Sequence, residues 1–418
     1  MKAFIPEIHR SGDIRAFEEK ISRISMRVLV EGTRGKSSTV MLLEEMIRGT
    51  GARTLAKITG ESPQIIHNGE HIDIFRERDN ILLDYDNIPS VISHDVDAII
   101  FENQAITPYT MRYIHHILRP RHIIIPNIRI DHTEGLGNDL AEMTENFARN
   151  WLVTDELKHV YYSEPIPKVH DLVFPILRDF AGQHPRHVVL HDVSIPPEYR
   201  EIPGIENFCN AAAFMQSTFG IHENPAPFLR RITEKLKVKV NCRSVRYVNA
   251  AKINDPISLI HMLRYLLRQT PEQVALVAYF RKDRVGRSDI FEDFFGEIDE
   301  KFGDRIERIW FAGFGTGHVF KHLPPRLREK TAINTDSDDI ETIIATAEAD
   351  NLIVIPIINR VNPFMDRLYA WLEDPEKAGT RTRYAFSAVS GLRELPASAC
   401  PEQPPADMMF LTARDKNF

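Results

Sequence analysis

The sequence predicts an α/β fold built as two successive units. Short apolar runs alternate with longer amphipathic stretches along the chain, which is the pattern of parallel strands covered by helices. A glycine-rich loop near residue 32 lies between an apolar run and an amphipathic stretch, as in α/β domains that bind phosphate. The polar segment at residues 235–244 separates two such patterns, so we place a domain boundary near residue 240.

The first unit, residues 1–240, begins its sheet with the apolar run Met26–Glu31, which predicts a buried strand. Apolar residues at helical spacing in Lys36–Gly51 predict a helix, and its final glycine is a suitable C-terminal stop. Further strands are expected at Ala98–Phe101 and His122–Pro126. The alanine-rich segment Gly204–Phe219 predicts another helix.

The second unit, residues 241–390, repeats the alternation on a smaller scale. Strands are predicted at Val274–Phe280, Ile309–Ala312 and Leu352–Ile357, and helices at Ser288–Phe302 and Pro363–Trp371. This order predicts a smaller Rossmann-like domain. Residues 391–418 have turn-forming composition and are expected to form a loosely attached tail.

Composition limits the classes of function. With 52 Lys and Arg against 59 Asp and Glu, the 418 residues carry a net charge of −7, which argues against broad binding to nucleic acid. Three scattered cysteines, Cys209, Cys242 and Cys400, are too few for a disulfide framework, so we expect a reducing cytoplasm. No apolar stretch approaches the roughly 20 residues of a spanning helix, and we expect neither secretion nor membrane insertion.

The glycine-rich loop is the strongest local signal in the sequence. Glycines let backbone amides approach phosphate groups, and the N-terminus of the following helix adds positive potential. Lys36 can reach the β and γ oxygens of a nucleotide, and the Ser37 hydroxyl can bind Mg²⁺. The loop therefore predicts a nucleotide phosphate site.

The loop is shorter than the general Walker pattern, which would place its first glycine at Val30. Its form G-T-x-G-K-S/T resembles the ATP loop of the Mur ligase superfamily, whose members join carboxylates to amines through an acyl phosphate. The resemblance implies a Mur-ligase-like ATP-binding domain that uses ATP and Mg²⁺. The phosphate-binding residues would be Gly32, Thr33, Arg34, Gly35, Lys36, Ser37 and Ser38.

The same resemblance implies two further metal ligands. Glu102 follows an apolar run, so it should emerge at the carboxyl end of a strand, where ligands gather in open α/β sheets. His132 lies in D-H-T-x-x-L-G, which resembles a motif of the folylpolyglutamate synthases and marks a second magnesium site in the superfamily. The implied metal ligands are thus Ser37, Glu102 and His132.

Other expected contacts come from the superfamily motifs in both domains. The segment Glu206–Ala212 resembles H-N-x-x-N-x-x-A, with glutamate in place of histidine, and implies that Asn207 contacts adenine. The second domain should close over the nucleotide and bring further residues to the ribose and the reacting groups. These are Arg243 or Arg246, Asn249 and Asp255, of which Asp255 is expected to be catalytic.

Within the superfamily, the chain resembles the ligase subunit of poly-γ-glutamate capsule synthesis. The resemblance is carried by G-x-R-G-K-S in the loop, V-N-x-x-x-x-N-D at Val248–Asp255 and R-x-D-R-V-x-R at Arg281–Arg287. Phe147 stands where many Mur and folate ligases have a lysine, which weighs against the folate branch. The loop begins 31 residues into the chain, so we expect no N-terminal domain for a uridine nucleotide.

The resemblance implies that glutamate or a related amine is added to a carboxylate. Arg281, Arg284 and Arg287 are spaced to bind a polyglutamate or small acidic substrate, or alternatively to pair with neighbouring aspartates. Membrane-bound synthase subunits at the inner membrane, and a second copy of the chain, are the partners that remain open. Two alternatives also remain, a folylpolyglutamate-synthase-like ligase and a P-loop nucleotide-binding regulator that makes no amide.

Overall fold

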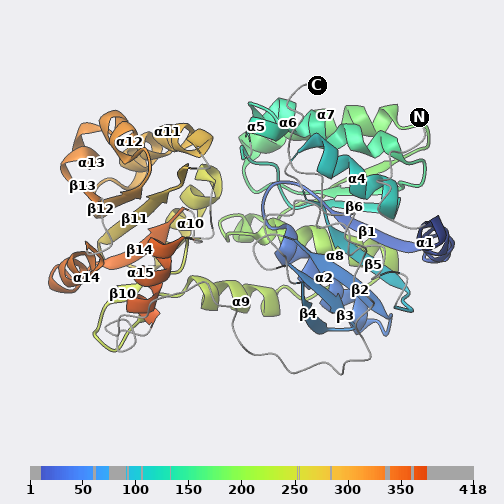
Figure 1. Ribbon diagram of the computed structural model, residues 1–418, viewed down its shortest axis with the longest axis horizontal. Coiled ribbons are helices and arrows are strands. Elements are labelled where there is room, and N and C mark those ends of the chain that lie inside the picture. The colour runs from blue at the N-terminus through green and yellow to red at the C-terminus, as the bar shows by residue number, and fades with distance from the viewer. Residues whose placement is uncertain are drawn as a thin grey trace, which may run out of the picture.

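The computed structural model describes residues 11–59, 63–74, 91, 94–104, 107–131, 133–251, 253, 255–282, 285–334, 339–358 and 362–373. Figure 1 shows two lobes, one with the blue-to-green elements and one with the yellow-to-red elements. Helix α9 (Ala226–Leu236) lies between them at the lower edge of the view. Each lobe is a sheet covered by helices, so the predicted two-unit α/β fold is confirmed.

The first lobe contains an eight-stranded sheet in the order β4-β3-β2-β5-β1-β6-β7-β8. All neighbours pair in parallel except β2 with β3 and β3 with β4, which are antiparallel. The strands are β1 (Met26–Val30), β2 (Thr54–Ile58), β3 (Gln64–His67), β4 (Glu70–Asp73), β5 (Ala98–Glu102), β6 (His122–Ile125), β7 (His159–Tyr162) and β8 (Val189–Asp192).

Helices cover both faces of this sheet because the central strands are apolar on both sides. Val28 and Val30 of β1 pack in one cluster with side chains of α2 (Lys36–Gly49) and α8 (Ile205–Phe219). Leu29 points to the opposite face and belongs to a second cluster. That face is covered by α4 (Pro108–Leu118), α6 (Leu140–Ala148), the 3-10 turn η2 (Arg149–Val153) and α7 (Pro167–Gln183).

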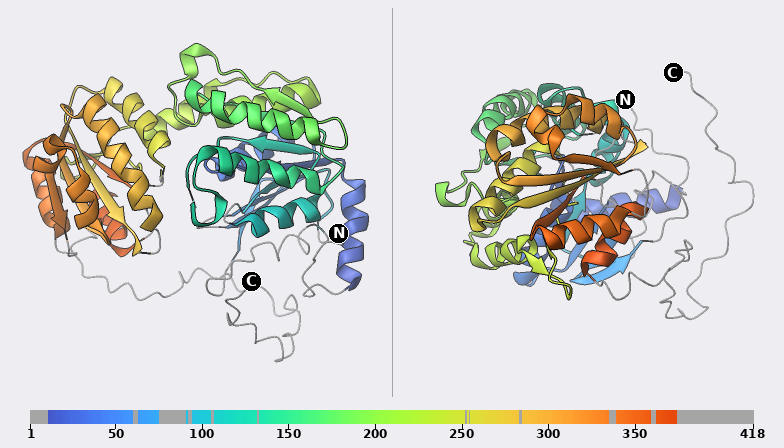
Figure 2. Two further views of the ribbon diagram at one scale, coloured as in Figure 1. Left: turned by 90° about the horizontal axis from the view of Figure 1, so that it is seen from above. Right: turned by 90° about the vertical axis from the view of Figure 1, so that its left-hand side faces the viewer.

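Shorter elements complete the first lobe. They are α1 (Ser11–Arg23), α5 (Thr133–Leu136) and the 3-10 turn η3 (Pro197–Tyr199). In both Figure 1 and the left view of Figure 2, α1 lies at the end of this lobe that is farthest from the second lobe.

The second lobe contains a six-stranded sheet in the order β13-β12-β11-β14-β10-β9, parallel except for β9. Its strands are β9 (Lys239–Val240), β10 (Arg246–Tyr247), β11 (Val274–Phe280), β12 (Ile306–Gly313), β13 (Thr331–Asn334) and β14 (Ile353–Ile357). Its helices are α10 (Pro256–Gln269), α11 (Val285–Phe302), α12 (Thr316–His322), α13 (Pro325–Glu329), α14 (Asp339–Ala349) and α15 (Pro363–Glu373).

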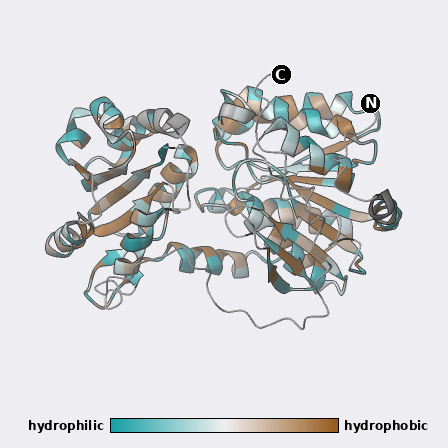
Figure 3. Cartoon of the chain, in the orientation of Figure 1, coloured by the Kyte–Doolittle hydropathy of each residue, from teal (hydrophilic) through white to brown (hydrophobic). Residues whose placement is uncertain are grey.

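The hydropathy pattern follows these layers. Brown, apolar segments lie along the strands and the inner helix faces, while teal segments lie on the outside of the lobes (Figure 3). Within the described ranges, no helix combines the length and the apolar character needed to cross a bilayer. The expected tail, residues 391–418, lies outside the described residues.

Strand register in the first sheet positions the site. Val30, the last residue of β1, pairs with Glu102 on one side and with Ile124 on the other. The carboxyl ends of β1, β5 and β6 are therefore adjacent, and the loops that leave them meet at one edge of the sheet. This is the edge where open α/β sheets bind ligands.

Candidate active site

The glycine-rich loop leaves β1 and enters α2 through two glycines with left-handed backbone angles. Gly32 has φ 110° and Gly35, the N-cap of α2, has φ 78°. A Cβ atom on Gly32 would lie 2.4 Å from the carbonyl oxygen of Asn127, and one on Gly35 would lie 2.4 Å from Asn207 Oδ1. Both positions therefore need glycine for backbone conformation and for space.

Lys36 begins α2 and turns back over its own loop. Its Nζ donates to the carbonyl oxygens of Gly32 at 2.8 Å and Thr33 at 3.1 Å. Burial lowers the pKa of Lys36, and the nearby Glu102 carboxylate opposes that shift. The ammonium group is thus placed among the free N–H groups of the helix start, where a phosphate would be held.

The loop is anchored to the segment that follows β6. Asn127 accepts from Thr33 N at its carbonyl oxygen, 3.0 Å, and from Arg34 N at Oδ1, 3.1 Å. Thr33 and Arg129 exchange two hydrogen bonds, with Arg129 N donating to Thr33 Oγ1 at 2.8 Å and that hydroxyl donating back to the carbonyl oxygen at 3.1 Å. These bonds fix the loop backbone against the neighbouring strand end.

Glu31, the residue before the loop, is fully buried and has three polar partners. Its carboxylate accepts from Trp151 Nε1 at 2.7 Å and Asn103 Nδ2 at 3.2 Å, and lies 2.9 Å from His115 Nε2. The start of the loop is therefore also held from the face of the sheet that α4 and η2 cover.

Two of the predicted metal ligands meet at the loop. Ser37 Oγ donates to Glu102 Oε2 at 2.8 Å, and the same oxygen accepts from the backbone N–H of Thr59 at 2.9 Å. Glu102 is only 6% exposed, at the carboxyl end of β5 where the sequence placed it. His132 lies outside the described residues. Among the residues that are described, no group of three or more His, Cys, Asp or Glu could hold a metal ion.

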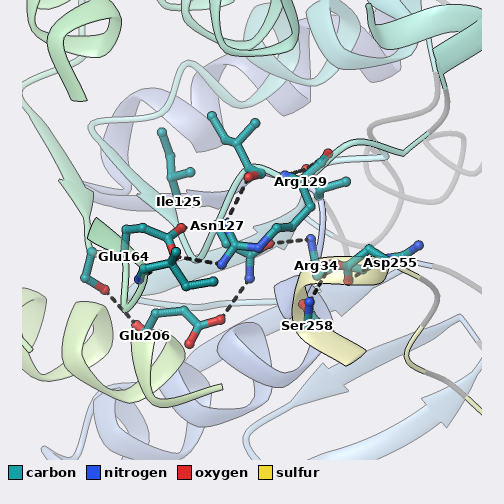
Figure 4. Close-up of polar contacts among 12 residues, drawn as sticks. Arg34, Ile125, Asn127, Arg129, Glu164, Glu206, Asp255 and Ser258 are labelled. Atoms are coloured by element: carbon teal, nitrogen blue, oxygen red, sulfur yellow. Dashed lines mark hydrogen bonds and ion pairs between the residues drawn. The ribbon is translucent and has the colours of Figure 1, made fainter. Parts of the chain in front are cut away.

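The first turn of α8 brings Glu206 and Asn207 against the loop. Asn207 lies beside Gly35, and its buried Oδ1 accepts no hydrogen bond from a described residue. Glu206 Oε1 accepts from Asn127 Nδ2 at 3.0 Å, and burial raises the pKa of Glu206 to about 7. Figure 4 shows this contact together with the neighbouring pair of Arg129 and Glu164.

Arg129 and Glu164 form a buried ion pair behind the loop. Nη1 and Nη2 of the arginine donate to the two carboxylate oxygens at 2.5 and 2.8 Å, and Arg129 is 2% exposed. The neighbouring carboxylates raise the pKa of Arg129 against the effect of burial. The pair is neutral overall, and its two bonds fix the Arg129 side chain behind the loop, just past the ends of β6 and β7.

The second lobe contributes Asp255, which lies beside Arg34 of the loop. Its Oδ1 accepts from Ser258 N at 2.8 Å and so caps α10, while Oδ2 lies 3.6 Å from Arg34 Nε. Arg34 also pairs with Asp131, with Nη2 to Oδ2 at 2.7 Å. The contact of Arg34 with Asp255 connects the two lobes at the loop, and Figure 4 shows these two residues side by side with Ser258.

The other predicted residues of the second lobe contact their own lobe. Asn249 Oδ1 accepts from the Tyr369 hydroxyl at 2.9 Å. Arg243 lies 3.4 Å from Glu348, and its guanidinium carbon is 5.5 Å from the centre of the Trp371 ring. The structure therefore does not bring Arg243 or Asn249 into contact with the loop.

Arg246 pairs with Glu272 and donates to the carbonyl oxygen of Asn351 at 2.6 Å, so it too is held within the second lobe. The structure describes only part of the arginine motif at residues 281–287. Arg281 is half-buried and has polar partners, Arg284 lies outside the described residues, and the side chain of Arg287 is not described.

Residues 235–374 match the family described as Poly-gamma-glutamate synthase CapB C-terminal domain. Among solved structures, MurF of Acinetobacter baumannii superposes with a TM-score of 0.59 at 12% identity, covering 85% of this chain and 78% of that one. The fold is that of the Mur ligases.

Folylpolyglutamate synthases share this Mur ligase fold. The Mycobacterium tuberculosis enzyme, in a structure with ADP and AMPPCP, has a TM-score of 0.56 at 13% identity and covers 83% of this chain and 92% of its own. The bifunctional enzyme of Yersinia pestis has a TM-score of 0.56 at 14% identity and covers 88% and 95%. At such identities the likeness shows the fold alone.

Sequence relatives point within this fold to the capsule-synthesis proteins. Capsule biosynthesis protein CapB of Bacillus anthracis is 24% identical over 295 residues, which is 66% of this chain and 62% of that protein. PGA synthase CapB of Bacillus subtilis (strain 168) is 27% identical over 138 residues, 32% of this chain and 35% of that protein. The chain thus spans less than two thirds of either relative, and it resembles them as the sequence motifs predicted.

Phe147, at the position of the lysine found in many Mur-fold ligases, has no polar role. It is fully buried in α6 and packs in the core cluster that contains Leu136, Met143 and Trp151. A cation at this position would have no place, because the surrounding side chains are apolar.

Sequence reasoning missed Asn127, Arg129 and Glu164. A signal was available, because Asn127 follows the predicted strand His122–Pro126 and Glu164 follows the apolar run at β7. Polar residues just past the carboxyl ends of parallel strands are candidates for the site. No motif singled them out, since their partners are distant in the sequence.

Proposed function

We propose that the chain is an ATP-dependent carboxylate–amine ligase that uses Mg²⁺ and forms its amide through an acyl phosphate. The observation that carries the proposal is the contact of Ser37 with Glu102 beside Lys36, at the N-terminus of α2. A hydroxyl, a carboxylate and an ammonium group converge where a helix start offers free N–H groups. The family match of residues 235–374 supports ligase chemistry over a regulatory P-loop protein.

The residues present fit a magnesium ion. Mg²⁺ prefers oxygen ligands and in nucleotide sites is held by one or two protein oxygens together with phosphates, which Ser37 and Glu102 would supply. His132 is proposed as a further ligand. Such an ion neutralises charge on the transferring phosphoryl group. Folylpolyglutamate synthase structures of the same fold, complexed with AMPPNP and Mn, support this assignment.

The residues of this chain would act by position and charge. Lys36 would exchange the carbonyl oxygens of Gly32 and Thr33 for phosphate oxygens, since among the described residues its ammonium donates to these two neutral acceptors. Asn207 and its neighbour Glu206 would border the adenine. Arg129, held by Glu164, would keep the loop backbone in place through its bonds with Thr33.

The reaction needs no nucleophilic side chain. A substrate carboxylate oxygen attacks the γ-phosphorus, and the bond to the β-phosphate oxygen breaks to release ADP. The amine nitrogen of the second substrate then attacks the carbonyl carbon, phosphate leaves, and the nitrogen loses a proton to give the amide. The protein orients both steps, which is the main source of rate in such chemistry.

We infer from the relatives that glutamate is added to an acidic acceptor, as in poly-γ-glutamate synthesis. Arg281, Arg284 and Arg287 remain the proposed binding residues for that acceptor. The proposed location is the cytoplasmic side of the inner membrane, with membrane-bound synthase subunits as partners.

The test is a screen of amino acids and short γ-glutamyl peptides for stimulated phosphate release, followed by mass spectrometry of the amide product. Lys36→Ala and Glu102→Gln should abolish amine-dependent ADP formation. Lys168→Ala, at an exposed lysine on α7, is the matched control and should keep it. Slow ATP hydrolysis that no amine stimulates would refute the ligase, and stimulation by a pteridine acceptor would favour the folate-type alternative.

A further inference from the structure

Arg34 lies between two aspartates that belong to different lobes. Its Nη2 is 2.7 Å from Asp131 Oδ2 in the first lobe, and its Nε is 3.6 Å from Asp255 Oδ2 in the second. The backbone of Arg34 is fixed, because its N–H donates to Asn127 Oδ1 at 3.1 Å. The phosphate loop therefore carries a cation whose side chain spans the boundary between the lobes (Figure 4).

Asp255 is placed for this contact by the start of α10. One oxygen caps the helix through Ser258 N at 2.8 Å, which fixes the rotation of the carboxylate and directs the other oxygen to Arg34. Asp255 is 1% exposed, and Oδ2 accepts no hydrogen bond from the described residues. A buried carboxylate needs a cation, and the guanidinium of Arg34 lies 3.6 Å from Oδ2, while Arg129 also acts on Asp255 electrostatically.

A second ion pair between the lobes is different in kind. Arg268 near the end of α10 pairs with Glu201 of the first lobe, but both side chains are largely exposed, at 62% and 41%. Solvent and salt screen such a pair, and it contributes little. Among the described residues, the contact of Arg34 with Asp255 is thus a shielded ionic link between the phosphate loop and the second lobe.

We propose that Arg34 and Asp255 form a positioning pair that holds the second lobe over the phosphate loop. This gives Asp255 a positioning role in place of the catalytic role expected from its motif. The activity readout rests on the proposed ligase function, but the arrangement of the lobes can be measured without it. Nucleotide binding depends on the first lobe, whereas amide formation needs both lobes aligned.

Asp255→Asn isolates the ionic contact, because asparagine caps a helix as well as aspartate but carries no charge. Glu201→Gln is the matched control, since it removes the exposed ion pair between the same two lobes. We expect Asp255→Asn to increase the radius of gyration in small-angle X-ray scattering, while circular dichroism shows that both lobes stay folded. Glu201→Gln should leave the scattering curve unchanged.

In the ligase assay we expect Asp255→Asn to lower kcat about 10- to 100-fold, the cost of misaligned reacting groups, with the KM for ATP within about twofold. In an Arg34→Met background the same substitution should have no further effect on kcat. A wild-type scattering curve for Asp255→Asn overturns the proposal whatever the kinetics. Absence of ligase activity in the wild type refutes the proposed function only, because the scattering comparison still decides the positioning pair.

Discussion

Glu206→Gln removes a buried acid whose charge the fold disfavours. Glu206 is 5% exposed at the start of α8, and burial raises its pKa from 4.5 to about 7 despite the nearby Arg129. Glutamine has the same shape and keeps an oxygen that accepts from Asn127 Nδ2, as Glu206 Oε1 does at 3.0 Å. The substitution therefore removes ionisation and preserves the hydrogen bond.

The raised pKa of Glu206 determines how the stability of the protein changes with pH. Because the folded protein binds this proton more tightly than the unfolded chain, the free energy of unfolding falls as the pH rises from 4.5 to about 7. One pKa unit corresponds to about 1.4 kcal/mol, so at pH 8 the ionised Glu206 costs about 3 kcal/mol relative to a neutral side chain. Near pH 5 the cost is under about 1 kcal/mol.

Urea unfolding of the two proteins at several pH values between 5 and 8 measures this difference. The stability advantage of Glu206→Gln should grow by about 2 to 3 kcal/mol across that range. Glu198→Gln, at an exposed glutamate, is the control and should show no such growth. A constant difference between wild type and Glu206→Gln at every pH would refute the reasoning.

Three further substitutions test other parts of the structure. Burial lowers the pKa of His122 to about 3, so the folded protein disfavours the charged imidazole. The stability that this gives above pH 6.5 is lost as the pH falls, by about 2 kcal/mol at pH 5. Urea unfolding of His122→Gln should show less of this loss. Phe147→Ala should lower the free energy of unfolding by about 3 to 5 kcal/mol, because the site is fully buried, and urea unfolding at neutral pH measures it. Gly35→Ala should abolish ATP binding in calorimetry, because the added Cβ would collide with Asn207. Gly51→Ala is the control, since Gly51 has a similar φ but a Cβ there would have no neighbouring atom within 4 Å, and it should retain binding. Equal binding by both variants would contradict the crowding argument.

The central part of the fold could be predicted from the sequence because its signals are local. The strand predicted at Met26–Glu31 is β1, and the helix predicted from Lys36 is α2, which ends two residues earlier than expected. The strand at Val274–Phe280 is confirmed residue for residue as β11. Each is a contiguous run in which the spacing of apolar residues predicts which side chains are buried.

The pair β3 and β4 was not predicted. β4 is exposed along its whole length, and its sequence EHID has a single apolar residue. It therefore lacks the apolar alternation that would indicate a strand. It exists because β3 continues the sheet and leaves an edge to pair with. Helix α1 was also absent from the prediction, although it covers the end of the first lobe (Figure 2).

The candidate site divides in the same way. The loop and Glu102 were predictable, one as a contiguous motif and the other as the end of an apolar run. The pair of Arg129 and Glu164 joins residues 35 apart, and the contact of Asn127 with Glu206 joins residues 79 apart. The strand order, with β6 between β1 and β7, brings these side chains together. That order cannot be predicted from the local patterns of a single sequence.

The three cations around the loop differ in what holds them, and this decides which can act on a phosphate. Arg129 forms two buried bonds with Glu164, and breaking such a pair typically costs about 3 to 5 kcal/mol, so it stays in place. Arg34 is shared between the carboxylates of the two lobes. Lys36 is held by two neutral carbonyl oxygens, which a phosphate oxygen can replace with a stronger, charge-assisted bond. In a chain of net charge −7, the phosphate site thus depends less on the number of cations than on holding this lysine through carbonyl oxygens that a phosphate can replace.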